Sequence, residues 1–400
     1  MSLKNKKIVL GVTGGIASYK AIELAGKLTK AGAKVKVIMT ENAQKFITPL
    51  TFAAITREKV FTKEFQLEVP IAHITLADWA DLILIAPATA NSIAKINAGI
   101  ADDLLTSTVL AATSPVLICP AMNINMFENK ITQGNINSLK ENGFRIMEPE
   151  SGMLACGYSG KGRLPAADEI VYFAESVFLE KGQRLDGLKI LITTGGCREK
   201  IDPMRFIGNL SSGKTGLAIA RAAFFRGADV TLVYASTDVK IPEYLNSVKT
   251  LSAKEMSDYV LAVKDDFDII LKAAAVADYT IENPASEKIK KNENFSLELV
   301  RTNDILLELG KTKKENTVLA GFAAESENIV ENAEAKLKKK NLDLIIGNNI
   351  NVTGSSETSV VIIGKDKKEF KGSKFETAHE ILHQIKKILE EKRSDTVISP

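Results

Sequence analysis

The side chains best suited to acid–base and thiol chemistry are few, since the chain has three histidines and three cysteines in 400 residues. A lone histidine is more often structural than catalytic, so the surroundings of His73, a Pro-Ile-Ala run before a predicted helix, leave its role open. Cys156 lies among Gly152, Gly157 and Gly160, and this flexible context indicates a functional lid thiol and not a packed core thiol. The cysteines show no paired spacing, which argues against a disulfide framework or a zinc site.

A first glycine-rich turn, at residues 11–18 (GVTGGIAS), could bind phosphate, because such turns place backbone N–H groups at the positive end of a helix. It does not fit G-x-G-x-x-G, and the next predicted strand ends in MTEN without the acidic residue that would hold an NAD ribose. The hydroxyls of Ser18 and Thr40 could bind a mononucleotide phosphate, or they could cap helices.

A second glycine-rich segment, at residues 208–215 (GNLSSGKT), matches the Walker A pattern letter for letter. A Walker A motif should leave a strand directly, whereas here the predicted strand ends near Thr194 and a polar loop intervenes. No apolar strand ends in an obvious Mg²⁺-holding aspartate, and Asp278 is only a weak candidate. The context therefore argues against a P-loop ATPase.

Two copies of a strand–loop–helix–strand unit position these segments. The first comprises strands at 7–13 and 34–40 around a helix at 17–30, and the second comprises strands at 189–194 and 229–234 around a helix at 213–226. Further strands are expected at 82–86, 116–119, 269–273, 318–322 and 344–347. Apolar strands without polar alternation are typical of parallel sheets buried on both faces. The pattern predicts an α/β protein with two Rossmann-like doubly wound domains.

The domain organisation follows from a polar stretch, FLEKGQRLDG at 178–187, between a helix and a new first strand. We expect one domain at 1–182, a second at 187–393 and a frayed tail at 394–400; a single large doubly wound domain is the alternative. On the terminal helix at 376–392, His379 and His383 are expected to be solvated, because two histidines without a third ligand nearby make no metal site.

The bulk composition excludes several classes of protein. A net charge of +3 is too small for a nucleic-acid-binding protein, in which a concentrated basic face is expected. No apolar stretch reaches the length of a membrane span, and the first apolar run is too short for a signal peptide. The expected location is the cytoplasm.

Small residues and an asparagine follow two further predicted strands, in APATAN at 86–91 and PAMNINM at 120–126. Such positions at carboxyl strand ends bind ligands in open α/β sheets. Together with GVTGGIASYK, AHI at 72–74, SGMLACG at 151–157 and the whole second half, they resemble the bifunctional phosphopantothenoylcysteine decarboxylase/phosphopantothenate–cysteine ligases of bacterial coenzyme A synthesis. The resemblance runs from about residue 6 to 390.

The resemblance implies a flavodoxin-like N-terminal decarboxylase domain that uses FMN to oxidise the substrate thiol, so that carbon dioxide can leave. It implies that His73 acts in the first stage of the reaction, near the thiol and the flavin. Asn123 would hold the substrate carboxylate, and Cys156 would donate the final proton. The implied FMN-binding residues are Gly14, Gly15, Ile16, Ala17, Ser18, Thr40, Ala88, Thr89, Asn91, Ser107 and Met122. Phe127 departs from the family, which usually has Trp or Tyr there.

The same resemblance implies a C-terminal domain that ligates 4′-phosphopantothenate to cysteine through an acyl-cytidylate, with CTP and Mg²⁺. Asn209 would contact the reacting carboxylate, Lys288 the triphosphate, and Asp278 the nucleotide or its metal. The remaining implied nucleotide-binding residues are Ala273, Ala274, Ala275, Asn303, Asp304, Ile305, Leu306, Phe322, Lys336 and Lys340. The lysines at 336–340 alone would suggest a solvated helix end. Family members usually have His at Leu210, Met at Thr215 and Pro at Asn303.

Small-molecule substrates are the implied partners, with no nucleic acid and no membrane. The resemblance also implies trimers of flavin domains and dimers of ligase domains, assembled as a homododecamer with FMN at a subunit boundary. A non-catalytic FMN-binding subunit remains the alternative from another class, and the joint presence of His73, Asn123 and Cys156 argues against it.

Overall fold

The structure is a computed structural model that describes residues 3–65, 69–153, 157–290, 296–325, 327–349 and 357–398. Contacts divide the chain into two compact units, Met1–Leu179 and Glu180–Pro400, each with its own sheet. The boundaries expected at 182 and 187 stay predictions. Among the helices of the described residues, none combines the length and apolarity needed to cross a membrane.

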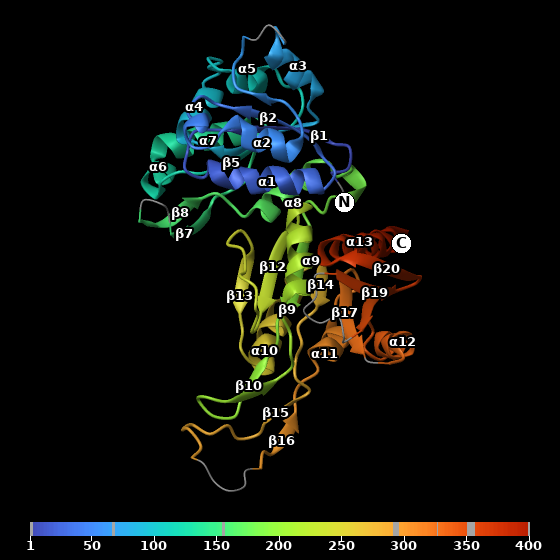
Figure 1. The fold of residues 1–400 in the computed structure, drawn as a ribbon. Coiled ribbons are helices and arrows are strands. Elements are labelled where there is room, and N and C mark those ends of the chain that lie inside the picture. Colours follow the sequence, from blue (N-terminus) through green and yellow to red (C-terminus); the bar gives the residue numbers. More distant parts are fainter. Residues whose placement is uncertain are drawn as a thin grey trace. The chain divides into compact units, whose positions relative to one another are not determined.

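The first unit is built on a six-stranded parallel sheet with the order β3-β2-β1-β4-β5-β6 (Figure 1). This is the 3-2-1-4-5-6 order of Rossmann sheets, which differs from the 2-1-3-4-5 order of flavodoxin. The doubly wound prediction is confirmed, with the Rossmann order in place of the flavodoxin one. The strands are β1 (Lys7–Val12), β2 (Lys34–Met39), β3 (Val60–Phe61), β4 (Leu82–Ala88), β5 (Val116–Pro120) and β6 (Arg145–Ile146).

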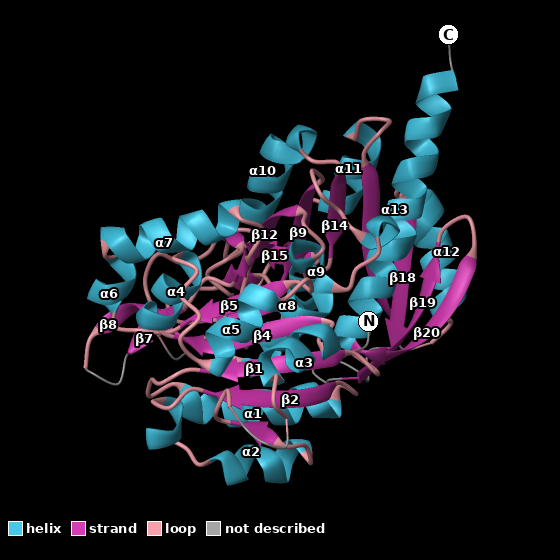
Figure 2. Ribbon diagram, turned by 90° about the horizontal axis from the view of Figure 1, so that it is seen from above, coloured by secondary structure: helices cyan, strands magenta, loops and turns pink. Residues whose placement is uncertain are grey.

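Helices cover both faces of this sheet, which explains its unbroken apolar strands (Figure 2). One face packs against α1 (Ser18–Lys30), α2 (Pro49–Thr56) and α8 (Ala167–Val177). The other packs against α3 (Ala72–Trp79), α4 (Ala90–Asn97), α5 (Leu104–Ala111), α6 (Ile124–Glu128) and α7 (Lys130–Glu141). An antiparallel ribbon of β7 (Glu150–Met153) and β8 (Ser159–Arg163) completes the unit.

The second unit repeats the same order in an eight-stranded sheet, β13-β12-β9-β14-β17-β18-β19-β20. In this sheet β19 pairs antiparallel with both of its neighbours, β18 and β20. The strands are β9 (Lys189–Thr194), β12 (Asp229–Tyr234), β13 (Asn246–Lys249), β14 (Ile269–Lys272), β17 (Val318–Glu325), β18 (Leu344–Asn349), β19 (Glu357–Ile363) and β20 (Lys367–Ser373). The predicted duplication is therefore present as two separate sheets, which excludes the single large sheet.

Helices α10 (Ala253–Val263), α11 (Ile305–Thr312) and α12 (Ile329–Lys339) contribute buried side chains to one face of this sheet. Helices α9 (Lys214–Phe225) and α13 (Lys374–Ile398) pack against each other. Two small hairpins extend from the sheet in Figure 1, β10 (Arg198–Lys200) with β11 (Phe206–Gly208), and β15 (Tyr279–Ile281) with β16 (Leu299–Arg301).

Two expectations for the terminal helix are wrong. The helix continues to Ile398, so residues 394–398 are helical and not a frayed tail. His379 is buried, with 5% of its surface exposed, and not solvated. Its Nδ1 accepts a hydrogen bond from Nε of Arg226 at 3.0 Å, because α13 packs this residue against the end of α9. A helix that faces the core on one side buries whichever histidine falls on that side.

Candidate active sites

Thr13 ties together the strand ends that form the first site. Its Oγ1 donates to the carbonyl of Pro87 at 2.8 Å and accepts from the N–H of Thr89 at 3.0 Å. The turn after β1 is thus fixed to the turn after β4, at the carboxyl edge where doubly wound sheets bind ligands. Sequence reasoning missed Thr13, although it lies inside the glycine-rich turn.

Close packing requires a glycine at position 14 of this turn but not at position 15. A Cβ at Gly14 would collide with Asn42, and one at Gly15 would lie 3.5 Å from Cγ2 of Thr89. The turn leads directly into α1, which begins at Ser18. A tight glycine turn at the start of a long helix suits the phosphate of a mononucleotide, so the residues present fit FMN.

The predicted hydroxyl ligands are already engaged within the chain. Oγ of buried Ser18 donates to the carbonyls of Thr13 at 2.9 Å and Gly15 at 2.5 Å. Oγ1 of Thr40 accepts from the N–H of Ala43 at 3.3 Å, and Oγ1 of Thr89 caps α4 by accepting from Ser92. Thr40 accepts from a backbone N–H, whereas Ser18 donates to carbonyls and does not cap α1, so a bound phosphate would depend mainly on backbone N–H groups.

The other predicted cofactor residues also lie in this unit. Ile16 is exposed, Ser107 is buried in α5, and Ala88 ends β4. Asn91 is an exposed residue in the first turn of α4.

The segment after β5 that is predicted to bind substrate, at residues 120–126, is held by the β7–β8 ribbon. The N–H of Met122 donates to the carbonyl of Gly162 at 2.9 Å, and a Cβ at Gly162 would collide with that same Met122. Oδ1 of Asn123 accepts from the N–H of Asn125 at 2.8 Å and so caps α6. Cys156 lies outside the described residues, but the strands on either side of it form the ribbon that packs beside Asn123.

His73 is the second residue of α3, and its Nδ1 lies 3.2 Å from Oε1 of Glu64. The two atoms are within ion-pair distance, but Nδ1 is not aligned for a hydrogen bond. Both side chains are partly exposed, His73 by 27% and Glu64 by 19%. Among the described residues of one chain, His73 shows no hydrogen bond or ion pair with Asn123. No motif or spacing in the sequence had singled out Glu64.

The second site lies at the carboxyl edge of β9, β14 and β17. Nδ2 of Asn209 donates to the carbonyl of Val276 at 3.2 Å, which joins the predicted carboxylate contact to the predicted nucleotide segment 273–275. Oγ1 of Thr194, at the end of β9, donates to the carbonyl of Gly213 at 2.9 Å, so the start of α9 is held against β9. The hairpin β10–β11 separates β9 from α9, which confirms that the Walker A match is accidental.

Lys336 of α12 and Lys340, which caps that helix, point into this site, whereas Lys338 and Lys339 are exposed. Nζ of Lys336 donates to the carbonyl of Phe322 at 2.9 Å, and Nζ of Lys340 forms an ion pair with Asp304 at 2.6 Å. Burial would raise the pKa of Asp304, but the ammonium of Lys340 outweighs it and the pKa is lowered. Burial and the charge of Lys340 lower the pKa of Lys336. These contacts bring the predicted residues together, and their role in binding a nucleotide stays a prediction.

The other predicted ligase residues lie around this cluster. Asn303, Ile305 and Leu306 flank the N-cap Asp304 of α11. Asp278 is exposed, and its charge acts on Lys336. In the part of the chain that the structure describes, no three acidic, histidine or cysteine side chains are grouped to hold a metal, so Mg²⁺ at Asp278 stays a prediction.

Lys288 is exposed, and its segment is anchored by a buried carboxylate that sequence reasoning missed. Asp202 pairs with the guanidinium of Arg205 and accepts from the N–H of Ile289 at 3.2 Å. Arg205 in turn donates to the carbonyl of Ile289 at 3.0 Å. The Arg205 bond holds the pKa of Asp202 well below its usual range despite desolvation. Both residues lie in the family-like stretch 201–213, but their hydrogen bonds to Ile289 join two segments that are distant in the sequence.

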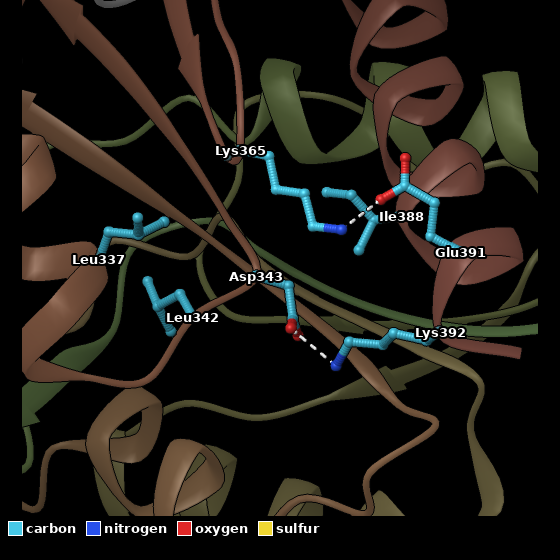
Figure 3. A pocket seen from close by; sticks show the side chains of 8 residues that line it. Leu337, Leu342, Asp343, Lys365, Ile388, Glu391 and Lys392 are labelled. Carbon is cyan, nitrogen blue, oxygen red and sulfur yellow. Dashed lines mark hydrogen bonds and ion pairs between the residues drawn. The ribbon is translucent and has the colours of Figure 1, made fainter. Parts of the chain in front are cut away.

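A cavity of about 270 Å³ lies at the opposite, amino-terminal edge of this sheet (Figure 3). Its charged side chains neutralise one another: Asp343 pairs with Lys392 at 2.7 Å, and Lys365 pairs with Glu391 at 2.7 Å. Because ligands bind at carboxyl strand ends and this cavity offers no unpaired charge, it is not the nucleotide site.

The comparisons with known proteins cover both units. The family model described as "DNA/pantothenate metabolism flavoprotein C-terminal domain" matches residues 185–389, and the model described as "Flavoprotein" matches residues 1–179. The solved C-terminal domain of a coenzyme A biosynthesis bifunctional protein CoaBC is 40% identical, with a TM-score of 0.45, and the match covers 52% of this chain and 98% of that one.

Two curated relatives match nearly the whole chain. The coenzyme A biosynthesis bifunctional protein CoaBC of Bacillus subtilis (strain 168) is 48% identical over 395 residues, covering 96% of this chain and 97% of the relative. That of Haemophilus influenzae is 42% identical over 393 residues, covering 96% and 98%. With a flavoprotein unit and a ligase-type unit in one polypeptide, the chain belongs to the family of bifunctional coenzyme A biosynthesis enzymes.

Proposed function

We propose that the chain catalyses two consecutive steps of coenzyme A synthesis. The C-terminal unit ligates 4′-phosphopantothenate to L-cysteine through an acyl-cytidylate, with CTP and Mg²⁺, and the N-terminal unit then decarboxylates 4′-phosphopantothenoylcysteine to 4′-phosphopantetheine with FMN. The observation that carries the proposal is the convergence of Asn209, Asp304, Phe322, Lys336 and Lys340 at one sheet edge, in a chain similar to the bifunctional relatives over both units.

In the decarboxylase unit, FMN would supply the reversible two-electron oxidation of the substrate thiol. The glycine turn before α1 would bind its phosphate, and Thr13 would keep that turn against β4. Asn123 would hold the substrate carboxylate, His73 would act at the thiol and Cys156 would donate the closing proton. With FMN at a subunit boundary, His73 would act on the flavin of a neighbouring chain.

In the ligase unit, carboxylate attack on the α-phosphate builds negative charge that cations must neutralise. Lys288 and Mg²⁺ near Asp278 would serve there, and Lys336, Lys340 and Phe322 would line the nucleotide pocket. The amine of cysteine would then open the acyl nucleotide. The enzyme would act in the cytoplasm as a homododecamer built from trimers and dimers.

The test is to incubate the pure protein with 4′-phosphopantothenate, cysteine and each nucleoside triphosphate in turn, following pyrophosphate and carbon dioxide separately. We expect yellow protein, repeated turnover with pyrophosphate release only when all three substrates are present, and carbon dioxide after it; without cysteine, pyrophosphate should stop at about one equivalent per site. Asn209→Ala should abolish pyrophosphate release while carbon dioxide still forms from added phosphopantothenoylcysteine. Asn123→Ala should release pyrophosphate normally but form no carbon dioxide. Colourless protein that takes up no FMN, or ATP cleavage without the acid substrate, would refute the corresponding half.

A further inference from the structure

Lys272, which no motif singled out, is the last residue of β14 at the centre of the C-terminal sheet, between β9 and β17. Side chains alternate along a strand, so Lys272 projects to the same face as Ile270. Ile270 packs with buried residues of α10, α11 and α12. Lys272 therefore points, at the ligand-binding edge, toward the helices that carry Asp304, Lys336 and Lys340.

The charges around Lys272 are unbalanced. Lys336 and Lys340 both repel its ammonium, and Asp304 attracts it. Asp304 is already paired with Lys340, and within the described residues no hydrogen bond or ion pair of Lys272 is found. Three ammonium groups therefore face one carboxylate in a half-buried space.

The remaining titratable groups on this face do not restore the balance. The thiol of Cys197 also faces Lys272, but burial raises its pKa to about 12, so it is uncharged at neutral pH. Asp278 and Glu325 act on Lys336 and are not among the groups that shift Lys272. The excess positive charge at this edge calls for an anion.

Keeping a cation here is costly for folding. Burial, followed by the charges of Lys336 and Lys340, lowers the pKa of Lys272 to about 8. A methionine of similar length would fill the space without that cost. Strongly shifted groups that lie beside other ligand-binding residues are candidates for function.

We propose that Lys272 is a further binding residue of the ligase site, whose ammonium group acts with those of Lys336 and Lys340 to hold the phosphates of the nucleoside triphosphate. The proposal rests on the ligase function proposed above and adds a residue to it. A bound polyphosphate favours the charged lysine, so nucleotide binding takes up a proton when the free site is neutral. Affinity should fall as the pH rises through about 8.

The test measures the affinity of the full-length protein for CTP with Mg²⁺ by calorimetry at pH 7 and pH 9, without 4′-phosphopantothenate or cysteine. If only the protonated site binds, the wild-type dissociation constant should rise about tenfold between these values. Lys272→Met should bind at least about tenfold more weakly at pH 7. Lys272→Arg keeps its charge at both values and should lose most of the pH dependence. Lys254→Met, an exposed matched control, should behave as wild type.

Thermal melting separates this role from a structural one. Without nucleotide, Lys272→Met should melt at the wild-type temperature or higher, because a buried cation is removed, yet CTP should raise its melting temperature less. Wild-type affinity and pH dependence in Lys272→Met would overturn the assignment while leaving the ligase function intact. Failure of the wild type to bind any nucleoside triphosphate would overturn both.

Discussion

Nδ1 of His73, in α3, lies 3.2 Å from Oε1 of Glu64, which precedes that helix in the chain. The carboxylate lies beside the imidazole within ion-pair distance, although the two atoms are not aligned for a hydrogen bond. We therefore expect Glu64 to act as a positioning residue that holds the imidazole of His73 in place without touching substrate.

Glu64→Gln should therefore lower decarboxylation by about tenfold or more while pyrophosphate release is unchanged. Glu58→Gln, at an exposed position in the same region, is the matched control. An unchanged decarboxylation rate in Glu64→Gln would mean that the approach of the two side chains has no role in the reaction.

Thr13→Val removes the hydroxyl that links the turns after β1 and β4. The buried carbonyl of Pro87 loses a donor and the N–H of Thr89 loses an acceptor, which should cost about 1–3 kcal/mol of stability. FMN should bind more weakly, as measured by flavin fluorescence on titration. Thr13→Ser keeps the hydroxyl and should restore most of the affinity, whereas equal weakening in both variants would contradict the role of the hydroxyl.

Asp202→Asn should release Arg205 and the backbone of Ile289, and with them the segment that carries Lys288. We expect pyrophosphate formation to fall by at least about tenfold, since misplacing a charged group by an ångström has large effects on rate. Decarboxylation of added substrate should not change. Asp258→Asn on the surface of α10 provides the control, and normal ligation in Asp202→Asn would show that Lys288 is positioned by other contacts.

His379 should make the stability of the C-terminal unit fall in mild acid. Burial and the nearby charge of Arg226 lower its pKa from 6.5 to about 2. Between these values the unfolded chain binds a proton that the folded chain does not, so stability is full above pH 6.5 and declines below it. Between pH 6.5 and pH 5 the free energy of unfolding should drop by roughly 2 kcal/mol.

Denaturant titrations of the full chain at several pH values would measure this drop. His379→Gln can still accept the Arg226 bond but does not titrate, so its stability should vary less over the same range. The same slope in the variant would assign the acid sensitivity to other groups.

The sequence alone determined the two doubly wound units, most strand and helix positions and the false Walker A match. These features depend on local periodicity and on the rule that parallel strands end at one edge, and both can be read from neighbouring residues. The resemblance to a known family, and not the position of elements, assigned Asn209, Asp304, Lys336 and Lys340 to one site.

Only the tertiary structure decided which side chains meet. The pairs His73–Glu64 and Arg226–His379, and Lys272 beside Lys336, depend on how helices pack against the sheets. The same packing turned the lysines at 336 and 340 from a plausible solvated helix end into partners of Phe322 and Asp304. Residue type and spacing fix the face of an element, but the charge environment of a group is the sum over segments that are distant in the chain, and it exists only once the chain has folded.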